Sequence, residues 1–212
     1  MERPVTDARS EIIDRIRHAL DTAPPKPVAV PRDYDNQPLT GAPDVNRFAE
    51  AVADYRARVY RVDAAELADT VAALVGTGTA VIPADLPQEW ATGVRTVIDE
   101  PPLGVEALDG VDAVITGCAV GIAATGTIVL DAGAAQGRRA LTLVPDHHIC
   151  VIRTDQIVDT VPQGFAALDP MRPLTFISGP SATSDIELER VEGVHGPRTL
   201  DVVIVATHNG SL

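Results

Sequence analysis

Residues 116–130 read TGCAVGIAATGTIVL, and this run of glycine, threonine and apolar residues is the best guide to the fold. A strand that ends in a Gly/Thr turn exposes backbone N–H groups, because glycine allows successive amides to point the same way. Nearby hydroxyl groups suit a carboxylate or a phosphate. We therefore predict that Thr125, Gly126 and Thr127 bind a small anionic ligand; the alternative is a tight hairpin in which glycine serves only the turn.

Outward from this stretch, helical and strand-like patterns alternate in the first half of the chain, and strands dominate the second half. Residues 111–116 are a mainly apolar run of the kind that is buried on both faces of a parallel sheet. Helices are predicted from Asp44 and over 63–76 and 154–168, and strands over 59–62, 80–83, 94–98, 127–130, 140–144, 148–152, 174–177 and 202–206. This order predicts an α/β fold with a mainly parallel sheet.

The N-terminal region has a different composition. Thr6 or Asp7 can cap a first helix, whose apolar face carries Ile12, Ile13, Ile16 and Leu20. Residues 23–43 are rich in proline and have few apolar anchors, which is typical of an extended arm. We therefore predict an N-terminal helix and arm over 1–43 and one domain over 44–212.

Composition excludes several classes of function. A net charge of −13 argues against a nucleic-acid partner and against an anionic membrane surface, because both need a basic face. Lys26 is the only lysine and lies in the proline-rich arm, which argues against a lysine Schiff base or a P-loop. The sequence shows no signal peptide and no apolar run of membrane-spanning length, so we expect a cytoplasmic protein without membrane insertion.

The cysteine pattern bears on cofactors. Cys118 and Cys150 are the two cysteines, and both lie in apolar runs, where we expect free, buried thiols. Because the chain has no Cys-x-x-Cys motif, we expect it to hold no iron–sulfur cluster and no structural zinc. His147 and His148 are neighbours on a strand and face opposite ways, so they cannot chelate one metal together. We therefore predict no metal and no cofactor in this chain.

Arginine and histidine side chains could supply the positive charge and the acid–base group of a site for an anion. In Gly137-Arg138-Arg139, neighbouring side chains cannot share a face, so one can reach a ligand while the other is solvated. His195 lies on a loop just before a strand and near Arg198, where it is a candidate general acid or base. The alternative is a loop histidine bound to backbone groups.

A third segment, Gly179-Pro180-Ser181, follows a strand and leads towards a predicted short helix, where its polar groups either cap the helix or bind an anion. We predict that these segments meet in one cleft at the carboxyl ends of the sheet strands. Arg138 or Arg198 is expected to balance the ligand's charge. The predicted ligand-binding residues are Thr125, Gly126, Thr127, Arg138, Gly179, Ser181, His195 and Arg198, with His195 as the candidate catalytic residue.

Taken in order, these motifs resemble those of the LUD domain family. They are Thr116-Gly117-Cys118, Ile122-Ala123-x-Thr125-Gly126-Thr127, Gly137-Arg138-Arg139 to Leu143-x-Pro145, Gly179-Pro180-Ser181-x-Thr183-x-Asp185-Ile186-Glu187 and Gly193-Val194-His195-Gly196-Pro197. Within that family they are most similar to the lactate utilisation protein C (YkgG-like) group. The resemblance covers residues 44–206. It implies a three-layer Rossmann-like sheet of the NagB/RpiA/CoA-transferase type.

The resemblance also implies a role in the oxidation of L-lactate to pyruvate, together with partner proteins that carry iron–sulfur clusters. This chain would be the component without clusters, binding a small anion or supporting assembly. One departure is Ala124, where relatives usually carry Asp or Glu, which weakens the case for catalysis by this chain. The alternatives are a stand-alone transferase or isomerase for a CoA ester or sugar phosphate, and a purely structural interaction module.

Overall fold

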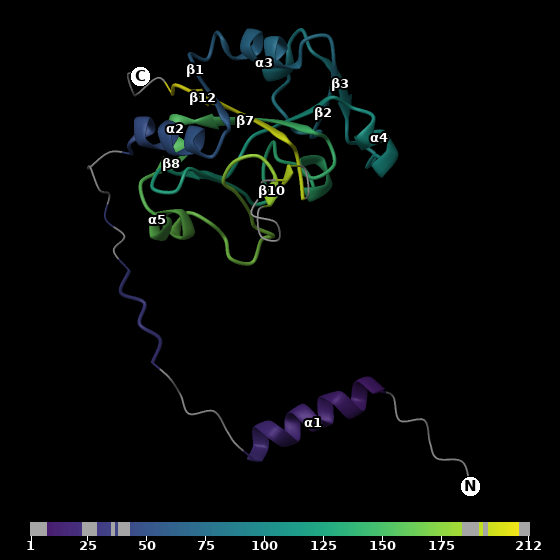
Figure 1. Ribbon diagram of the computed structural model, residues 1–212, viewed down its shortest axis with the longest axis vertical. Coiled ribbons are helices and arrows are strands. Elements are labelled where there is room, and N and C mark those ends of the chain that lie inside the picture. The colour runs from purple at the N-terminus through teal and green to yellow at the C-terminus, as the bar shows by residue number, and fades with distance from the viewer. Residues whose placement is uncertain are drawn as a thin grey trace. The chain divides into compact units, whose positions relative to one another are not determined.

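The computed structural model describes residues 8–22, 29–34, 37, 43–183, 191–192 and 195–207 (Figure 1). The chain divides into two compact units, Met1–Tyr34 and Asp35–Leu212. The first unit contains helix α1 (Ala8–Thr22), which has no buried residue; its apolar side chains Ile12, Ile16 and Leu20 are all more than half exposed. The sequence-based boundary between residues 43 and 44 remains a prediction.

The second unit is built on a parallel sheet of six strands. Their order is β1 (Arg58–Val62), β12 (Thr199–Val205), β7 (His147–Arg153), β4 (Ala113–Thr116), β2 (Thr79–Ile82) and β3 (Arg95–Ile98). Every neighbouring pair is parallel. The central strands β4, β7 and β12 are buried almost throughout, which is why their sequences are nearly continuous apolar runs. The predicted α/β fold and parallel sheet are confirmed.

A second, smaller sheet has four strands in the order β8 (Ile157–Val158), β5 (Val120–Ile122), β6 (Thr127–Leu130) and β9 (Thr175–Ile177). Here β5–β6 and β6–β9 are antiparallel, whereas β5–β8 is parallel. Short strands β10 (Ala182–Thr183) and β11 (Val191–Glu192) form an antiparallel pair. Residues 120–130 are therefore the central hairpin of the smaller sheet.

The layers follow from the alternation of side chains along the six strands. One face packs against α3 (Leu67–Val75) and the 3₁₀ helix η1 (Gln88–Ala91). The other face packs against α2 (Val45–Asp54) and the four-stranded sheet, with α4 (Val105–Asp109) and η2 (Arg139–Thr142) over β2 and β4. The result is three layers, of which the third contains a sheet as well as helices (Figure 1). The NagB/RpiA/CoA-transferase assignment remains a prediction.

Two predicted elements are wrong in type. Residues 140–144 were expected to form a strand, but η2 occupies this place, because β4 already pairs with β2 on one side and β7 on the other. Residues 154–168 were expected to be one helix, but they form η3 (Thr154–Gln156), β8 and α5 (Val161–Ala166). The Thr160 side chain caps α5, so the helix begins only after β8 has paired with β5.

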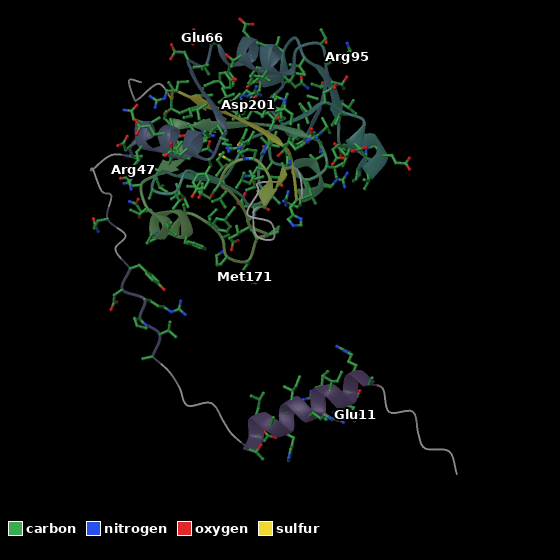
Figure 2. The ribbon with its side chains drawn as sticks, viewed as in Figure 1. Glu11, Arg47, Glu66, Arg95, Met171 and Asp201 are labelled. Carbon is green, nitrogen blue, oxygen red and sulfur yellow. The ribbon has the colours of Figure 1, made fainter. Side chains whose placement is uncertain are left out.

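A buried carboxylate joins the amino ends of β1, β7 and β12. Asp201 is fully buried and accepts hydrogen bonds from Arg58 Nη2 and His147 Nε2, both at 2.7 Å; Figure 2 shows it within the six-stranded sheet. The hydrogen bond and charge of Asp201 raise the pKa of Arg58. His147 and His148 indeed point to opposite faces, since His148 lies with Cys150 on the side of the four-stranded sheet.

Candidate functional site

A polar cavity of about 210 Å³ lies at the amino ends of β7 and β12, on the side of the four-stranded sheet. His148 and Leu200, the second residues of these strands, lie opposite each other and form its floor. Its walls are Arg139 and Thr142 of η2, residues 175–181, which include β9 and the loop after it, and residues 195–197 before β12. We call this space the amino-end cavity.

Arg139 supplies positive charge to the amino-end cavity. Its Nη1 donates to the carbonyl oxygen of Thr142 (2.9 Å) and to its hydroxyl (3.0 Å). No carboxylate among the described residues pairs with this guanidinium. Partial burial lowers the pKa of Arg139, but the group stays charged at any physiological pH. Arg139 thus presents a cation whose natural partner is an anion from outside the chain.

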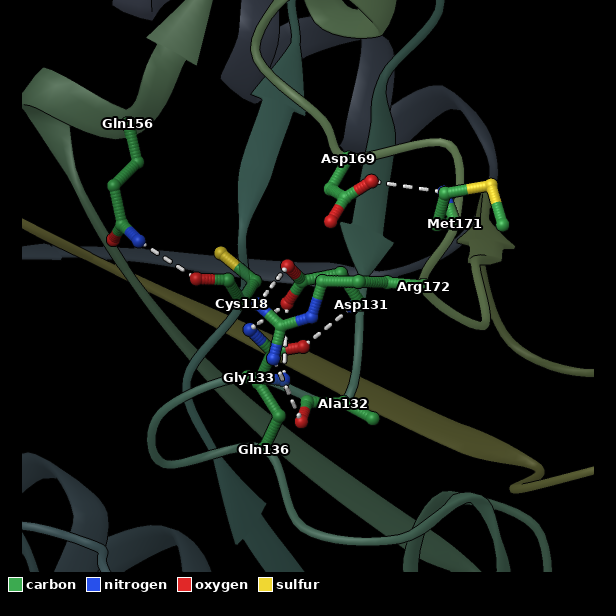
Figure 3. Close-up of polar contacts among 9 residues, drawn as sticks. All are labelled: Cys118, Asp131, Ala132, Gly133, Gln136, Gln156, Asp169, Met171 and Arg172. Atoms are coloured by element: carbon green, nitrogen blue, oxygen red, sulfur yellow. Dashed lines mark hydrogen bonds and ion pairs between the residues drawn. The ribbon is translucent and has the colours of Figure 1, made fainter.

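The loop that leads to Arg139 is held firmly. After β6, the carboxylate of Asp131 accepts hydrogen bonds from Gly133 N (3.0 Å), Gln136 Nε2 (2.8 Å) and Arg172 Nη1 (2.8 Å), as Figure 3 shows. Ala132 and Ala135 have positive φ angles of 53° and 59°, which non-glycine residues rarely adopt. These contacts fix the conformation of the segment that carries Arg139 into η2.

His148 is the buried imidazole of the cavity. It is 2 % exposed, and burial, followed by the charges of His147 and Arg139, lowers its pKa to about 3. Its Nε2 lies 2.8 Å from the hydroxyl of the fully buried Thr116. If that hydroxyl donates to Nε2, both groups are satisfied and the proton of the neutral ring is on Nδ1. Nδ1 has no hydrogen-bond partner among the described residues, and His148 lines the cavity.

The two loops at the mouth of the cavity are joined to each other. Ser181 Oγ accepts a hydrogen bond from the backbone N–H of His195 (2.9 Å), and Ser181 N donates to the carbonyl of Pro197 (2.8 Å). The His195 side chain is exposed and lines the same cavity. The structure therefore brings together Gly179, Ser181 and His195, three of the residues expected to share a site.

The Thr125–Thr127 turn does not line the cavity but touches its wall. Thr127 Oγ1 hydrogen bonds to Ser178 Oγ (2.8 Å), which is in the wall, and to Thr125 Oγ1 (2.7 Å). A Cβ atom on Gly126 would lie 2.5 Å from the backbone carbon of Ala51 in α2. The turn therefore packs against α2, which is the close approach that requires glycine here.

The two arginines expected to balance a ligand's charge are held by carboxylates elsewhere. Arg138 donates to both oxygens of Asp99 (2.6 and 2.9 Å), and this contact lowers the pKa of Asp99. Arg198 donates to Asp146 through Nε (2.8 Å) and likewise lowers that carboxyl's pKa. Neither arginine lines the cavity; among the described residues, the neighbouring Arg139 supplies its guanidinium.

The position of the cavity differs from the expected one. Ser181 and His195 were expected at the carboxyl ends of the sheet strands, but they lie beside the amino ends of β7 and β12. That expectation followed the usual rule for open α/β sheets, and for these residues it is wrong. Here the smaller sheet supplies a wall at the opposite end.

Within the described residues, no group of three or more His, Cys, Asp or Glu side chains is placed to hold a metal ion. Cys118 and Cys150 are free and buried, as predicted, and Cys150 together with burial raises the pKa of the Cys118 thiol. No helix in the described part of the chain is long and apolar enough to span a membrane.

Comparisons with known proteins agree with the motifs. Residues 105–205 match the model of the LUD domain. Lactate utilization protein C of Deinococcus radiodurans is 49% identical over 205 residues, covering 94% of this chain and 96% of that protein. The protein of the same name from Geobacillus kaustophilus is 27% identical, with coverages of 97% and 99%.

A solved structure agrees as well. The crystal structure of a DUF162 family protein from Deinococcus radiodurans superposes with a TM-score of 0.66 and 46% identity, covering 76% of this chain and 95% of that one. The 49% identity to the Deinococcus radiodurans relative, over 94% of this chain, shows common descent. The chain belongs to the LUD domain family, among the relatives named lactate utilization protein C.

Proposed function

We propose that this protein is the component of an L-lactate utilisation system that binds a small carboxylate, such as L-lactate or pyruvate, in the amino-end cavity. The names of its relatives support the lactate role. The volume, about 210 Å³, is below the range of about 300–1,000 Å³ common for drug-sized ligands, and suits a smaller acid.

One observation carries the proposal. The chain has a net charge of −13, yet none of the described residues lining this cavity is an aspartate or a glutamate. The lining instead offers a guanidinium, two imidazoles and several hydroxyl groups. Such a surface in an acidic protein favours an anion, because its polar groups can donate hydrogen bonds and none of them carries a negative charge.

Each group has a role in this proposal. Arg139 binds the carboxylate with the N–H groups that Thr142 does not use, and Nδ1–H of His148 donates a further hydrogen bond from the floor. Ser181 offers a hydroxyl at the mouth. His195, exposed on the same side, is the candidate acid–base group for the hydroxyl of lactate.

We further propose that the protein acts in the cytoplasm with partner proteins that carry iron–sulfur clusters. Oxidation of L-lactate to pyruvate releases two electrons and two protons, and clusters in the partners would accept the electrons. The cysteine content supports this division of labour, because clusters are held by about four cysteine thiolates and this chain has two cysteines, both buried. Free thiols are also typical of a reducing compartment.

Calorimetric titration tests the binding role. The full-length protein should bind L-lactate or pyruvate, and Arg139→Gln should weaken binding by about tenfold or more, as expected for loss of a charge-assisted hydrogen bond. Arg138→Gln is the matched control, because its side chain is outside the cavity. Equal affinity of both variants, or no binding by the wild-type protein, would contradict the proposed site.

Co-purification tests the partnership separately. The tagged protein, isolated from its native host grown on L-lactate, should bring down iron-containing proteins in a fixed ratio. Iron analysis and mass spectrometry of the eluate provide the measurement. An eluate without iron would contradict the partnership. The binding role would still be decided by the titration.

A further inference from the structure

A second cavity lies at the opposite end of the six-stranded sheet. It has a volume of about 590 Å³ and is lined at its base by Arg153 and Val205, the last residues of β7 and β12, which lie opposite each other. The first turn of α3 forms one wall and η1 forms another. We call this space the carboxyl-end cavity. In open α/β sheets, ligands bind outside the carboxyl ends of the strands.

We propose that the carboxyl-end cavity binds a nucleotide, with its base on Trp90 and its phosphate at Arg153. The site is distinct from the amino-end cavity, and the proposal does not depend on the function proposed for that cavity. The volume falls within the range of about 300–1,000 Å³ that is usual for ligands of this size.

Trp90 supplies a platform for a flat ring. One edge of its indole packs against the backbone after β4, since a Cβ atom on Gly117 would lie 3.6 Å from Trp90 Cζ3. The side chain is only partly buried against the core and also lines the cavity. An indole that is fixed on one side and open on another is suited to stacking with a base.

Arg153 supplies the charge for a phosphate. It is the one cation among the described residues that line this cavity. Its Nε donates to Asp155 (2.9 Å), but both side chains are about half exposed. Such surface pairs contribute little free energy, so the guanidinium can turn to a phosphate at small cost. Thr92 and Thr207 line the same space.

Glu89 accounts for the part of the ligand between base and phosphate. It is adjacent to Trp90 in η1 and also lines the cavity. A carboxylate opposes a phosphate but accepts hydrogen bonds from sugar hydroxyls, as acidic residues do in dinucleotide-binding folds. The lining therefore combines a stacking surface, a hydroxyl acceptor and a cation, which are the three parts that a nucleoside phosphate requires.

The single tryptophan makes the proposal easy to test. Trp90 is the only tryptophan of the chain, so the tryptophan fluorescence arises from a side chain that lines this cavity. Titration of the full-length protein with AMP should change the fluorescence in a saturable way. Ribose 5-phosphate lacks the base. It should bind at least about tenfold more weakly than AMP, because stacking contributes much of the affinity.

Variants distinguish the contacts. Arg153→Gln should weaken AMP binding by about tenfold, whereas Arg95→Gln, an exposed arginine on β3 outside the cavity, should leave it unchanged. Equal affinities for the two variants would overturn the proposal. So would the absence of saturation with AMP at millimolar concentration. L-Lactate titration is read separately, because its site is at the other end of the sheet.

Discussion

The two ends of the six-stranded sheet carry cavities of opposite character. The amino-end cavity is the smaller, about 210 Å³ against 590 Å³, and it is lined by Arg139, His148 and hydroxyl groups without a carboxylate. The carboxyl-end cavity is lined mainly by Ala, Leu and Val together with Trp90 and Arg153. The difference shows that a second sheet, packed on one face of a parallel sheet, creates a polar site where such sheets usually have none.

The largest expected effect comes from Gly126, which holds the wall of the amino-end cavity against α2. Gly126→Ala should lower the free energy of unfolding by about 3 kcal/mol or more, because the new Cβ meets the Ala51 backbone and the φ angle is +57°. Urea unfolding measures this. Gly104→Ala, with φ −68° and open space around the new Cβ, should change that free energy by less than about 0.5 kcal/mol. Equal losses of unfolding free energy would show that α2 can move away from the new methyl group at little cost.

A pH-dependent effect of intermediate size should come from His148. The folded protein keeps this ring neutral to about pH 3, whereas the unfolded chain protonates it below about pH 6.5. Between these values the unfolded state binds more protons, so stability falls as the pH falls, by about 2 kcal/mol from pH 7 to pH 5. Chemical unfolding at both pH values measures the difference.

The control for this prediction is His148→Gln, which should remove most of the dependence between pH 7 and pH 5. The carboxyls of Asp99 and Asp146 have lowered pKa values, so their contribution is lost only below about pH 4 and does not interfere. An unchanged slope in the variant would place the titrating group elsewhere.

A smaller effect should separate the two neighbouring arginines. Arg138→Gln should cost about 1.5 kcal/mol, because the Asp99 side chain is only 6% exposed and would lose its charged donor. Arg139→Gln should change stability by less than about 0.5 kcal/mol, since no described carboxylate depends on it. Thermal unfolding of both variants checks this. A larger loss for Arg139→Gln would assign that residue to folding rather than to binding.

The smallest effect concerns the two cavities together. The two cavities lie at opposite ends of the strands, so saturating L-lactate should change the affinity for AMP by less than about twofold. By reciprocity, AMP should change the affinity for L-lactate by the same factor. Trp90 fluorescence, recorded with and without lactate, gives the comparison. A larger factor would show that the sheet couples its two ends.

The parallel sheet could be predicted well, because strands that are buried on both faces have nearly continuous apolar sequences, as in residues 113–116 and 148–152. It failed where sheet neighbours decide the outcome. Leu141 is fully buried, yet its segment is helical, because β4 already has a strand on each side. Ile157 forms a strand because β5 offers an edge, which no local pattern reveals.

The candidate site could be predicted only in part, for a similar reason. Gly179, Ser181 and His195 were found from turn chemistry, but a glycine turn that packs against a helix looks the same in sequence as one that binds an anion. Strand alternation separated His147 from His148 without showing which of them lines the amino-end cavity. Arg138 and Arg139 are adjacent, and only the fold shows which of them meets Asp99.

The amino-end cavity takes its lining from both sheets, since His148 belongs to the larger sheet and Ile177 to the smaller one. A ligand held between them therefore belongs to the folded state alone. By mass action, its concentration adds to the stability of the protein, by about 2.7 kcal/mol at one hundred times the dissociation constant. For a marginally stable chain, the lifetime in the cell would then rise and fall with the supply of the acid that it is proposed to bind.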